Sequence, residues 1–262
     1  MNERNVERMI CPSIARFNPV AAVFWIFALS CLSFRSAGAA VPKFCTGCNF
    51  VGLSLAGADF SNAVYVGSNF ANVDLRRASL RGAKLVAANF EGADLRGAVL
   101  DGSDCTACNF EGAKLDRASF SGARMTVVNF NGFDSLLATT QLRELLTGCT
   151  VCNFHAARLA GRDLSGLRLL SIDFSGADLR DSTFEGAALC WYDTRSKGRV
   201  TKCDNMRGAQ MRDTNLRSVQ LCGKPLERRG CFAVDAEMLR RYTGSKLEGA
   251  ILPSPKSEAS SL

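Results

Sequence analysis

The sequence predicts a solenoid, a chain wound into repeated turns, and two regularities carry that prediction. A leucine, phenylalanine or similar apolar residue occupies every fifth position from Phe50 to Phe130, seventeen times in succession. A helix repeats its apolar face at about 3.6 residues and a strand at about 2, so a strict period of five requires a backbone unit that closes every five residues. The pair Asn-Phe recurs every twenty residues, which makes one turn twenty residues long: Asn49/Phe50, Asn69/Phe70, Asn89/Phe90, Asn109/Phe110 and Asn129/Phe130.

Stretches such as AKLVAANFEGADLRGAVLDG (residues 83–102) resemble the A-(D/N)-L-x-x signature of the pentapeptide repeat family. The resemblance implies an all-β solenoid, a right-handed quadrilateral β-helix with four repeats per coil, and about seven coils are expected over residues 41–232. In that family the central residue of each repeat and the residue two before it point inward. Large Leu or Phe therefore alternates with small residues in a narrow core, and the continuous repeat predicts one elongated domain.

Two excursions interrupt the predicted β-helix. Residues 133–148 add only four residues to one coil, and their segment TTQLRELLTG (residues 139–148) places leucines at helical spacing after threonine caps. A short helix that forms a structural bulge is predicted there, with a binding loop as the alternative. The second excursion is residues 191–203, after which the repeat resumes at Met206.

The C-terminal part is predicted to close the solenoid. Residues 233–252 contain VDAEMLRRY, whose apolar spacing favours an amphipathic capping helix, followed by residual repeats centred on Leu247 and Leu252. Residues 253–262 are polar and are predicted to form a disordered tail.

Residues 1–40 read as a secretory signal peptide. Arginines precede an apolar run over residues 20–32, and small residues follow up to Ala39 and Ala40. The run is short for a membrane span, so no stable span is expected in the mature chain. An uncleaved anchor and lipidation of Cys31 are the alternatives. The protein is therefore predicted to be exported, to a bacterial periplasm or outside the cell.

The charge balance argues against two functions. Removal of residues 1–40 leaves 28 basic and 23 acidic side chains, a net charge of +5. Well-known members of the pentapeptide repeat family mimic DNA with an acidic surface and bind DNA gyrase in the cytoplasm, so that role is disfavoured for a basic, exported chain. Nucleic acid binding is also not expected, because basic residues alternate with aspartates on one face.

Six of the ten cysteines that follow residue 40 lie in three copies of C-T-x-C-N-F. In the implied coil, the first Cys of each copy is central on one face, here called face one, and the second points inward on the next face, so the pair brackets a turn. Residues i and i+3 of a turn lie within about 7 Å, close enough for a disulfide, and no neighbouring coil offers another cysteine. Three disulfides are predicted: Cys45–Cys48, Cys105–Cys108 and Cys149–Cys152.

The other four cysteines bracket the irregular segments, and their predicted pairs are Cys190–Cys203 and Cys222–Cys231. Disulfides agree with an oxidising compartment. The rival interpretation of C-x-x-C is thiol redox chemistry or metal binding, but a redox cysteine needs exposure, and these side chains should point inward. Cys149, Cys152 and His155 have zinc-like spacing, yet no fourth ligand is evident.

No catalytic set can be assembled, since His155 is the single histidine and the carboxylates follow the repeat rather than converging. The glycines recur at corners and form no phosphate-binding loop. The protein is therefore not expected to be an enzyme, and no cofactor or metal is expected.

One face stands out by its outward residues. Face one carries apolar residues where other faces carry Asp, Arg, Asn and Ser, and these form the candidate interface: Val64, Val66, Val86, Val127, Leu170 and Trp191. Contiguous exposed apolar groups mark an interface with an unidentified protein partner or a second copy. The alternative is that valine merely suits an extended wall. Together these features predict an exported, disulfide-stabilised, non-catalytic scaffold for protein–protein interaction.

Overall fold

The computed structural model describes residues 41–169, 171–192, 200–223, 231–243 and 247–252. The predicted signal peptide and C-terminal tail lie outside these residues. The chain forms two compact units: the first ends at Asn129 and also includes Ser135–Gly148, and the second comprises Phe130–Asp134 and the residues from Cys149 onward.

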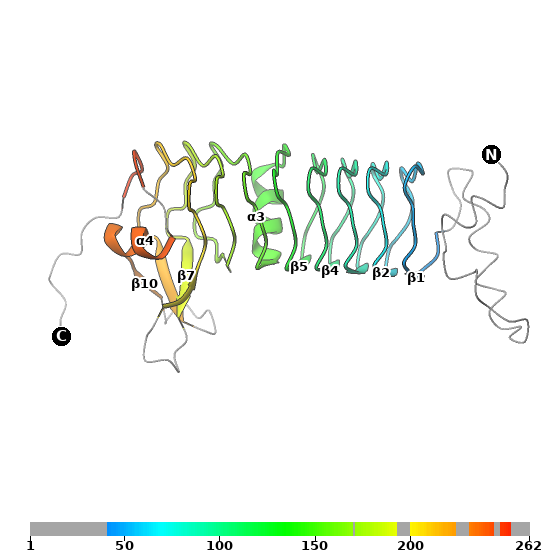
Figure 1. The fold of residues 1–262 in the computed structure, drawn as a ribbon, viewed down its shortest axis with the longest axis horizontal. Helices are drawn as coiled ribbons and strands as arrows, with labels where there is room; N and C mark the ends of the chain where they lie inside the picture. The colour runs from blue at the N-terminus through cyan, green and yellow to red at the C-terminus, as the bar shows by residue number, and fades with distance from the viewer. Residues whose placement is uncertain (1–40, 170, 193–199, 224–230, 244–246, 253–262) are drawn as a thin grey trace, which may run out of the picture. The chain divides into compact units, whose positions relative to one another are not determined.

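The first unit is a parallel β-solenoid (Figure 1). Five short strands pair in sequence order, one from each turn: β1 (Phe44–Thr46), β2 (Val64–Val66), β3 (Lys84–Val86), β4 (Asp104–Thr106) and β5 (Arg124–Thr126). Their register places Cys45 beside Tyr65 and Leu85 beside Cys105, twenty residues apart. The predicted turn length and the predicted fold class are therefore confirmed.

Backbone hydrogen bonds join every turn to the next. The Phe50 N–H donates to the Asn69 carbonyl at 2.8 Å, and the Asn69 N–H donates back to the Cys48 carbonyl at 2.7 Å. The same pattern repeats through the first unit, so the interior turns satisfy their backbone polar groups on both sides.

The core of the first unit is a stack of aromatic rings flanked by small residues. Ring centroids are 4.5 Å apart for Phe50 and Phe70, 4.9 Å for Phe70 and Phe90, and 4.8 Å for Phe90 and Phe110. Ala83 and Ala93 are fully buried beside them. The two inward positions of each repeat are thus occupied as the family resemblance implied.

The helix expected over residues 139–148 is α3 (Thr139–Gly148). It buries Leu142, Leu145 and Leu146, the three leucines whose spacing indicated a helix. Gly148 ends the helix so close to the Ala123 backbone carbonyl that a side chain there would clash.

The second unit departs from the regular coil. It contains β6 (Cys149–Thr150), β7 (Ala188–Tyr192), β8 (Val200–Cys203), β9 (Gln220–Gly223), β10 (Cys231–Ala233) and the helix α4 (Ala236–Thr243), which is the short C-terminal helix expected from the sequence. β7 pairs in parallel with β9, while β8 and β10 pair antiparallel with β7 and β9.

The solenoid has about five regular turns, slightly fewer than the seven expected. The regular turns are those whose strands β1–β5 pair at a constant step of twenty residues, whereas the step lengthens to thirty-two residues between Asp173 and Asn205 in the second unit.

Candidate interaction surface

The three C-x-x-C copies each close one corner of a turn. Cys45 and Cys48 have Cα atoms 5.9 Å apart, as do Cys105 and Cys108, while those of Cys149 and Cys152 are 5.7 Å apart. Each separation falls in the range that a disulfide requires. The distances arise because each pair brackets a tight turn, with a left-handed residue such as Gly47 or Ala107 between the cysteines. Oxidation of these thiols in the cell stays a prediction.

The other predicted pairs fall at strand positions that oppose each other. Cys190 lies opposite Cys203 in the β7–β8 pair, and Cys222 lies opposite Cys231 in the β9–β10 pair. The side chains of Cys190, Cys203 and Cys222 are outside the described set, so these pairings also stay predictions.

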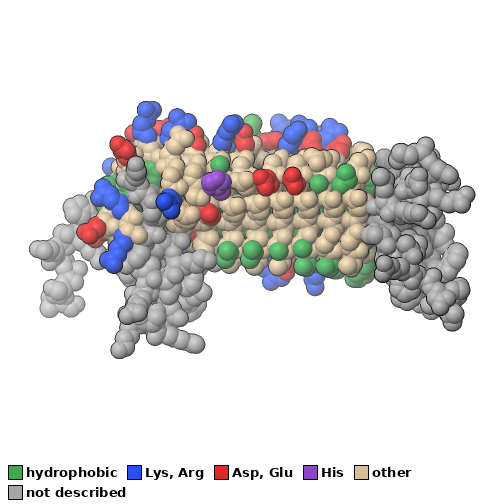
Figure 2. All heavy atoms as spheres, viewed as in Figure 1, with side chains coloured by type: hydrophobic (Ala, Val, Ile, Leu, Met, Phe, Trp, Pro, Cys, Tyr) green, Lys and Arg blue, Asp and Glu red, His purple; other side chains and the backbone are tan. Residues whose placement is uncertain are grey.

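Face one of the first unit carries an exposed apolar strip on β1–β3, with a further apolar residue at the corner after β5. We define this strip by Phe44, Val64, Val66, Val86 and Val127. Val66 is 38% exposed, Val86 41% and Val127 55%, while Val64 is half-buried. Figure 2 shows hydrophobic side chains in a row along the edge that carries β1–β5 in Figure 1. Four of the predicted interface residues therefore share one surface.

Phe44 belongs to this strip and was not predicted. Its side chain is 67% exposed, more than any of the valines. The register pairs Phe44 with Val64, so the two side chains are neighbours along the solenoid axis. The sequence contained a signal for its exposure. Phe44 comes one residue before Cys45, just as the outward residue Val64 comes one residue before Tyr65.

The remaining two interface residues are not placed by the structure. Leu170 lies outside the described residues. Trp191 is in β7, with a backbone register opposite Lys202, and its side chain is outside the described set.

Val127 combines exposure with an unfavourable backbone conformation. Its φ is +56°, in the left-handed region that β-branched residues avoid. Equivalent corners of earlier turns carry Gly47 and Gly67, then Ala87 and Ala107. Glycine would therefore fit the corner with less strain, and the exposed valine is not explained by packing.

A second column of side chains on the first unit has a structural role. The Asn109 amide donates to Asn89 Oδ1 at 3.2 Å, and the Asn129 amide donates to Asn109 Oδ1 at 2.9 Å. Each Oδ1 of Asn89 and Asn109 also accepts the backbone N–H two residues on, at 3.1 Å. The amides thus tie adjacent turns together.

A charged wall carries repeated ion pairs within single turns. Arg76 binds Asp74 through two nitrogens at 2.9 and 2.7 Å, and Arg96 binds Asp94 in the same way at 2.8 and 2.6 Å. These guanidinium hydrogen bonds hold the pKa of Asp74 and Asp94 below the ordinary value for aspartate. Figure 2 shows basic and acidic side chains alternating along the upper edge. Mixed signs make this wall a poor surface for nucleic acid.

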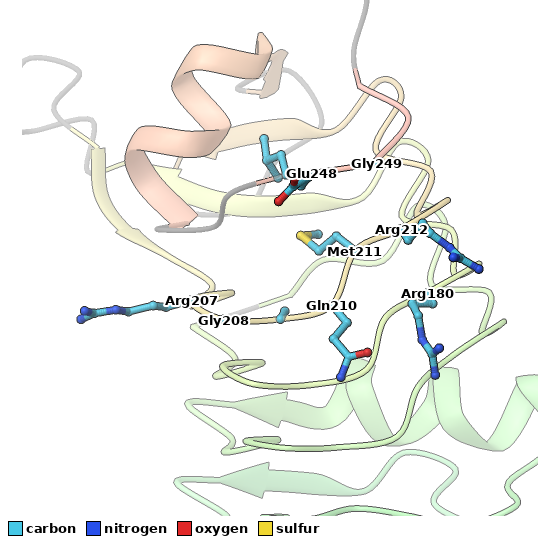
Figure 3. A pocket seen from close by; sticks show the side chains of 10 residues that line it. Arg180, Arg207, Gly208, Gln210, Met211, Arg212, Glu248 and Gly249 are labelled. Atoms are coloured by element: carbon cyan, nitrogen blue, oxygen red, sulfur yellow. The ribbon is translucent and has the colours of Figure 1, made fainter.

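A hollow of about 810 Å³ lies in the second unit beside Met211 and residues 247–249. Arg180, Arg207 and Arg212 line it, but Figure 3 shows their side chains pointing in different directions, with Arg207 directed away from the hollow. Arg180 is also held by Asp178 at 2.7 Å. Since the guanidinium groups do not converge, the hollow lacks the geometry of an anion site.

The described residues contain no group of three or more His, Cys, Asp or Glu side chains placed to hold a metal ion. His155 is exposed, and its Nδ1 lies 2.9 Å from Ser175 Oγ. In the part of the chain that the structure describes, each helix is too short or too polar to cross a membrane.

The repeats match the family model for pentapeptide repeats in eight copies, which together cover residues 45–132 and 152–189. No curated protein sequence matches the chain. Solved structures with a similar fold include HetL, a pentapeptide repeat protein involved in heterocyst differentiation regulation from the cyanobacterium Nostoc sp. strain PCC 7120. It is 22% identical, with 67% of this chain and 73% of that chain covered and a TM-score of 0.42.

Two further structures are similar to parts of the chain. QnrB1, a plasmid-mediated fluoroquinolone resistance protein, is 17% identical over 78% of this chain and 92% of its own, with a TM-score of 0.39. A pentapeptide repeat protein of the Arabidopsis thaliana thylakoid lumen is 30% identical over 42% of this chain and 78% of its own, with a TM-score of 0.32. With a five-residue period, a twenty-residue parallel turn and eight matched repeat copies, the chain belongs to the pentapeptide repeat family.

Proposed function

We propose that the protein is an exported, non-catalytic scaffold that binds another protein through the apolar strip, and that its paired cysteines staple the solenoid. The observation that carries the proposal is the strip itself: Val66 and Val86 are exposed neighbours in the register, Phe44 and Val64 pair on the first two strands, and Val127 is exposed at the corner after β5. An exposed apolar surface of this kind is favourable only when a partner covers it.

The conformation of Val127 supports a role for its side chain. A left-handed L-residue costs about 1–2 kcal/mol, and β-branching adds to the strain. The chain accepts this cost at a corner where Gly47 and Gly67 avoid it on equivalent turns. A side chain that destabilises the free protein and faces solvent is expected to contribute in a complex.

The size of the strip restricts its partner. Even the whole wall of five strands, spaced about 4.8 Å apart and each about 10 Å long, presents only roughly 240 Å². A stable interface buries about 800 Å² on each side. Two copies that met through this strip alone would bury too little, so we favour a different protein that lays a helix or an extended segment along the strip and contacts its charged margin. That margin contains Lys84 and the pair Arg124–Asp104, whose atoms are 2.6 Å apart.

Export and disulfide formation rest on separate grounds. The first 40 residues have the organisation of a signal peptide, and three equivalent cysteine pairs have Cα distances that suit disulfides. The thiol-redox and metal-binding alternative is weakened because both sulfurs of the Cys105 and Cys149 pairs are buried. A DNA-mimic role like that of cytoplasmic family members is disfavoured by the net positive charge.

Site-specific crosslinking tests the binding surface. A photoreactive amino acid at Val86 should crosslink to a defined partner in the native envelope, and Val66→Asp should abolish that adduct, because a buried carboxylate would lose its hydration. The matched control is Val51→Asp, which changes a valine that is 47% exposed but lies outside the strip.

The two variants separate the outcomes. Loss of the adduct in Val66→Asp with retention in Val51→Asp supports the strip as the interface. Equal crosslinking in both variants contradicts it. N-terminal sequencing of the mature protein checks export, and a first residue of Ala40 or Val41 is expected; an intact Met1 in a cytoplasmic fraction contradicts export.

A further inference from the structure

We propose that the Cys45–Cys48 disulfide exchanges with dithiols in solution. The Cys105–Cys108 and Cys149–Cys152 disulfides do not react with dithiols while the protein is folded. The inference rests on the proposed function in one respect: the three pairs must be oxidised in the mature protein. It adds a thiol-exchange site, placed at one end of the apolar strip.

Burial distinguishes the first pair from the others. Cys45 is half-buried, whereas Cys105 is 0% exposed, Cys108 2%, and Cys149 and Cys152 each 1%. A thiolate must approach a disulfide sulfur directly, so a pair with both residues buried reacts only after local unfolding.

Sheet topology explains the difference. β4 has a strand on each side, and its Cys105 lies between Leu85 and Met125. β1 is the edge strand, and Cys45 has Tyr65 as its strand neighbour on one side. The three cysteine pairs have the same sequence motif, but within the described residues no turn precedes β1 to cover the first pair.

The reaction balances with a dithiol as reductant. One thiolate of the dithiol attacks Cys45 Sγ, because Cys48 is fully buried, and the Cys45–Cys48 bond breaks as Cys48 leaves as a thiolate and takes a proton from water. The second thiol of the reductant then attacks the mixed disulfide and releases Cys45. Two electrons pass to the protein, and the reductant becomes a cyclic disulfide.

Thiol exchange at Cys45–Cys48 would change the mobility of one end of the apolar strip. Phe44 precedes Cys45 in β1, and β1 is held to β2 by hydrogen bonds from Val64 N–H to Lys43 O and from Gly47 N–H to Val66 O, both at 2.8 Å. Lys43 Nζ also donates to the Ser61 carbonyl at 2.8 Å. Opening the pair removes the covalent constraint on this edge strand, so reduction should loosen Phe44 while leaving β3 to β5 in place.

The experiment is stepwise reduction of the exported full-length product. Samples receive increasing dithiothreitol, are quenched with one alkylating reagent, are then fully reduced, and receive a second, isotopically distinct reagent before peptide mass spectrometry. Cys45 and Cys48 are expected to take the first label at least about tenfold faster than the four buried cysteines, because those require local opening. Equal rates at the three pairs, or faster labelling of Cys105, would overturn the proposal.

Two controls keep the result interpretable. A sample without reductant reports whether the pairs are oxidised at all, so free thiols there would refute the disulfide part of the proposed function rather than the order of exchange. A Cys45→Ser/Cys48→Ser variant should leave the slow labelling of Cys105 and Cys108 unchanged. If their labelling accelerates to the rate seen for Cys45, the order reflects unfolding from the N-terminal end and the exchange site is rejected.

Discussion

The two units of the chain build their turns from the same repeat, but the number of residues between paired turns is constant in the first unit and varies in the second. In the first unit every bridge between neighbouring turns pairs residues that are twenty positions apart, such as Asn89 and Asn109. In the second unit, Asp173 pairs with Asn205, thirty-two residues later. The rings of Phe70 and Phe90 stack at 4.9 Å with planes 9° apart, while those of Phe154 and Phe174 are 6.0 Å apart and tilted by 31°.

The difference shows that the register between turns is kept when an insertion begins and ends at neighbouring positions of the wall, whatever the length of the insertion. The β7–β8 hairpin leaves the wall after Leu189 and rejoins it at Asp204, whose N–H donates to the Leu189 carbonyl at 2.8 Å. The chain therefore returns to the position it left, and the next turn resumes the register. The aromatic stack also ends here, since Met206 takes the position after Phe174.

The largest expected effect concerns the aromatic stack. Phe90→Ala should destabilise the protein by about 3–5 kcal/mol, because it leaves a cavity between Phe70 and Phe110. Phe174→Ala should fall at the lower end of that range, since its ring contacts are looser. Denaturation in guanidinium chloride measures both. A loss for Phe174→Ala that equals or exceeds that for Phe90→Ala would contradict the view that the close stacking of Phe90 stabilises the fold more than the looser ring contacts of Phe174.

The second effect concerns the packing of α3 against the turns of the first unit. Gly148→Ala should cost about 1–3 kcal/mol, because the added Cβ meets the Ala123 carbonyl and the backbone must shift. Gly122→Ala is the matched control, with a φ of +65° but no atom within 4 Å of the new Cβ, and should cost about 1 kcal/mol. Thermal unfolding monitored by circular dichroism compares them; equal melting temperatures would show that α3 does not dock closely.

A smaller effect is expected along the amide column. Asn109→Ala removes amide bonds to both neighbouring turns and should cost about 1 kcal/mol. Asn205→Ala in the second unit removes one amide bond, to Asp173 at 2.9 Å, and should cost less. Chemical denaturation of the two variants tests the order. A larger loss in Asn205→Ala would indicate that the column is not the element that ties regular turns.

The smallest effect is electrostatic and depends on pH. Guanidinium hydrogen bonds lower the pKa of Asp94 in the first unit and of Asp178 in the second. A carboxyl with a lowered folded pKa contributes stability above its unfolded pKa, near 3.8, and loses it as the pH falls through the folded value. Because the pairs are solvated, Asp94→Asn and Asp178→Asn should each cost less than about 1 kcal/mol at neutral pH.

Melting temperatures measured from neutral pH to about pH 2 test this assignment. The wild type and each variant should differ at neutral pH and converge at low pH. A difference that persists at the acid end would show that the substitution acts through packing and not through the ion pair.

Much of the fold and part of the candidate surface follow from the sequence. The five-residue period identifies Phe50 and Ala83 as inward and Val66 and Val86 as outward, and leucine spacing indicates α3. The exposure of Phe44 could have been predicted, since it occupies the same outward position as Val64 in the next turn. The antiparallel strands β8 and β10 were missed because their segments carry no period.

The sequence by itself determined which residues face the core, how long a turn is and where the cysteine pairs sit, because each turn repeats the same local geometry and neighbouring turns contact equivalent positions. Only the tertiary structure decided which of the three C-x-x-C corners has a cysteine that is not fully buried, that Val127 holds a left-handed conformation while exposed, and that Asp204 returns to Leu189 after the insertion. These properties depend on what lies above and below each turn, and a repeat that is the same in every turn carries no information about its ends.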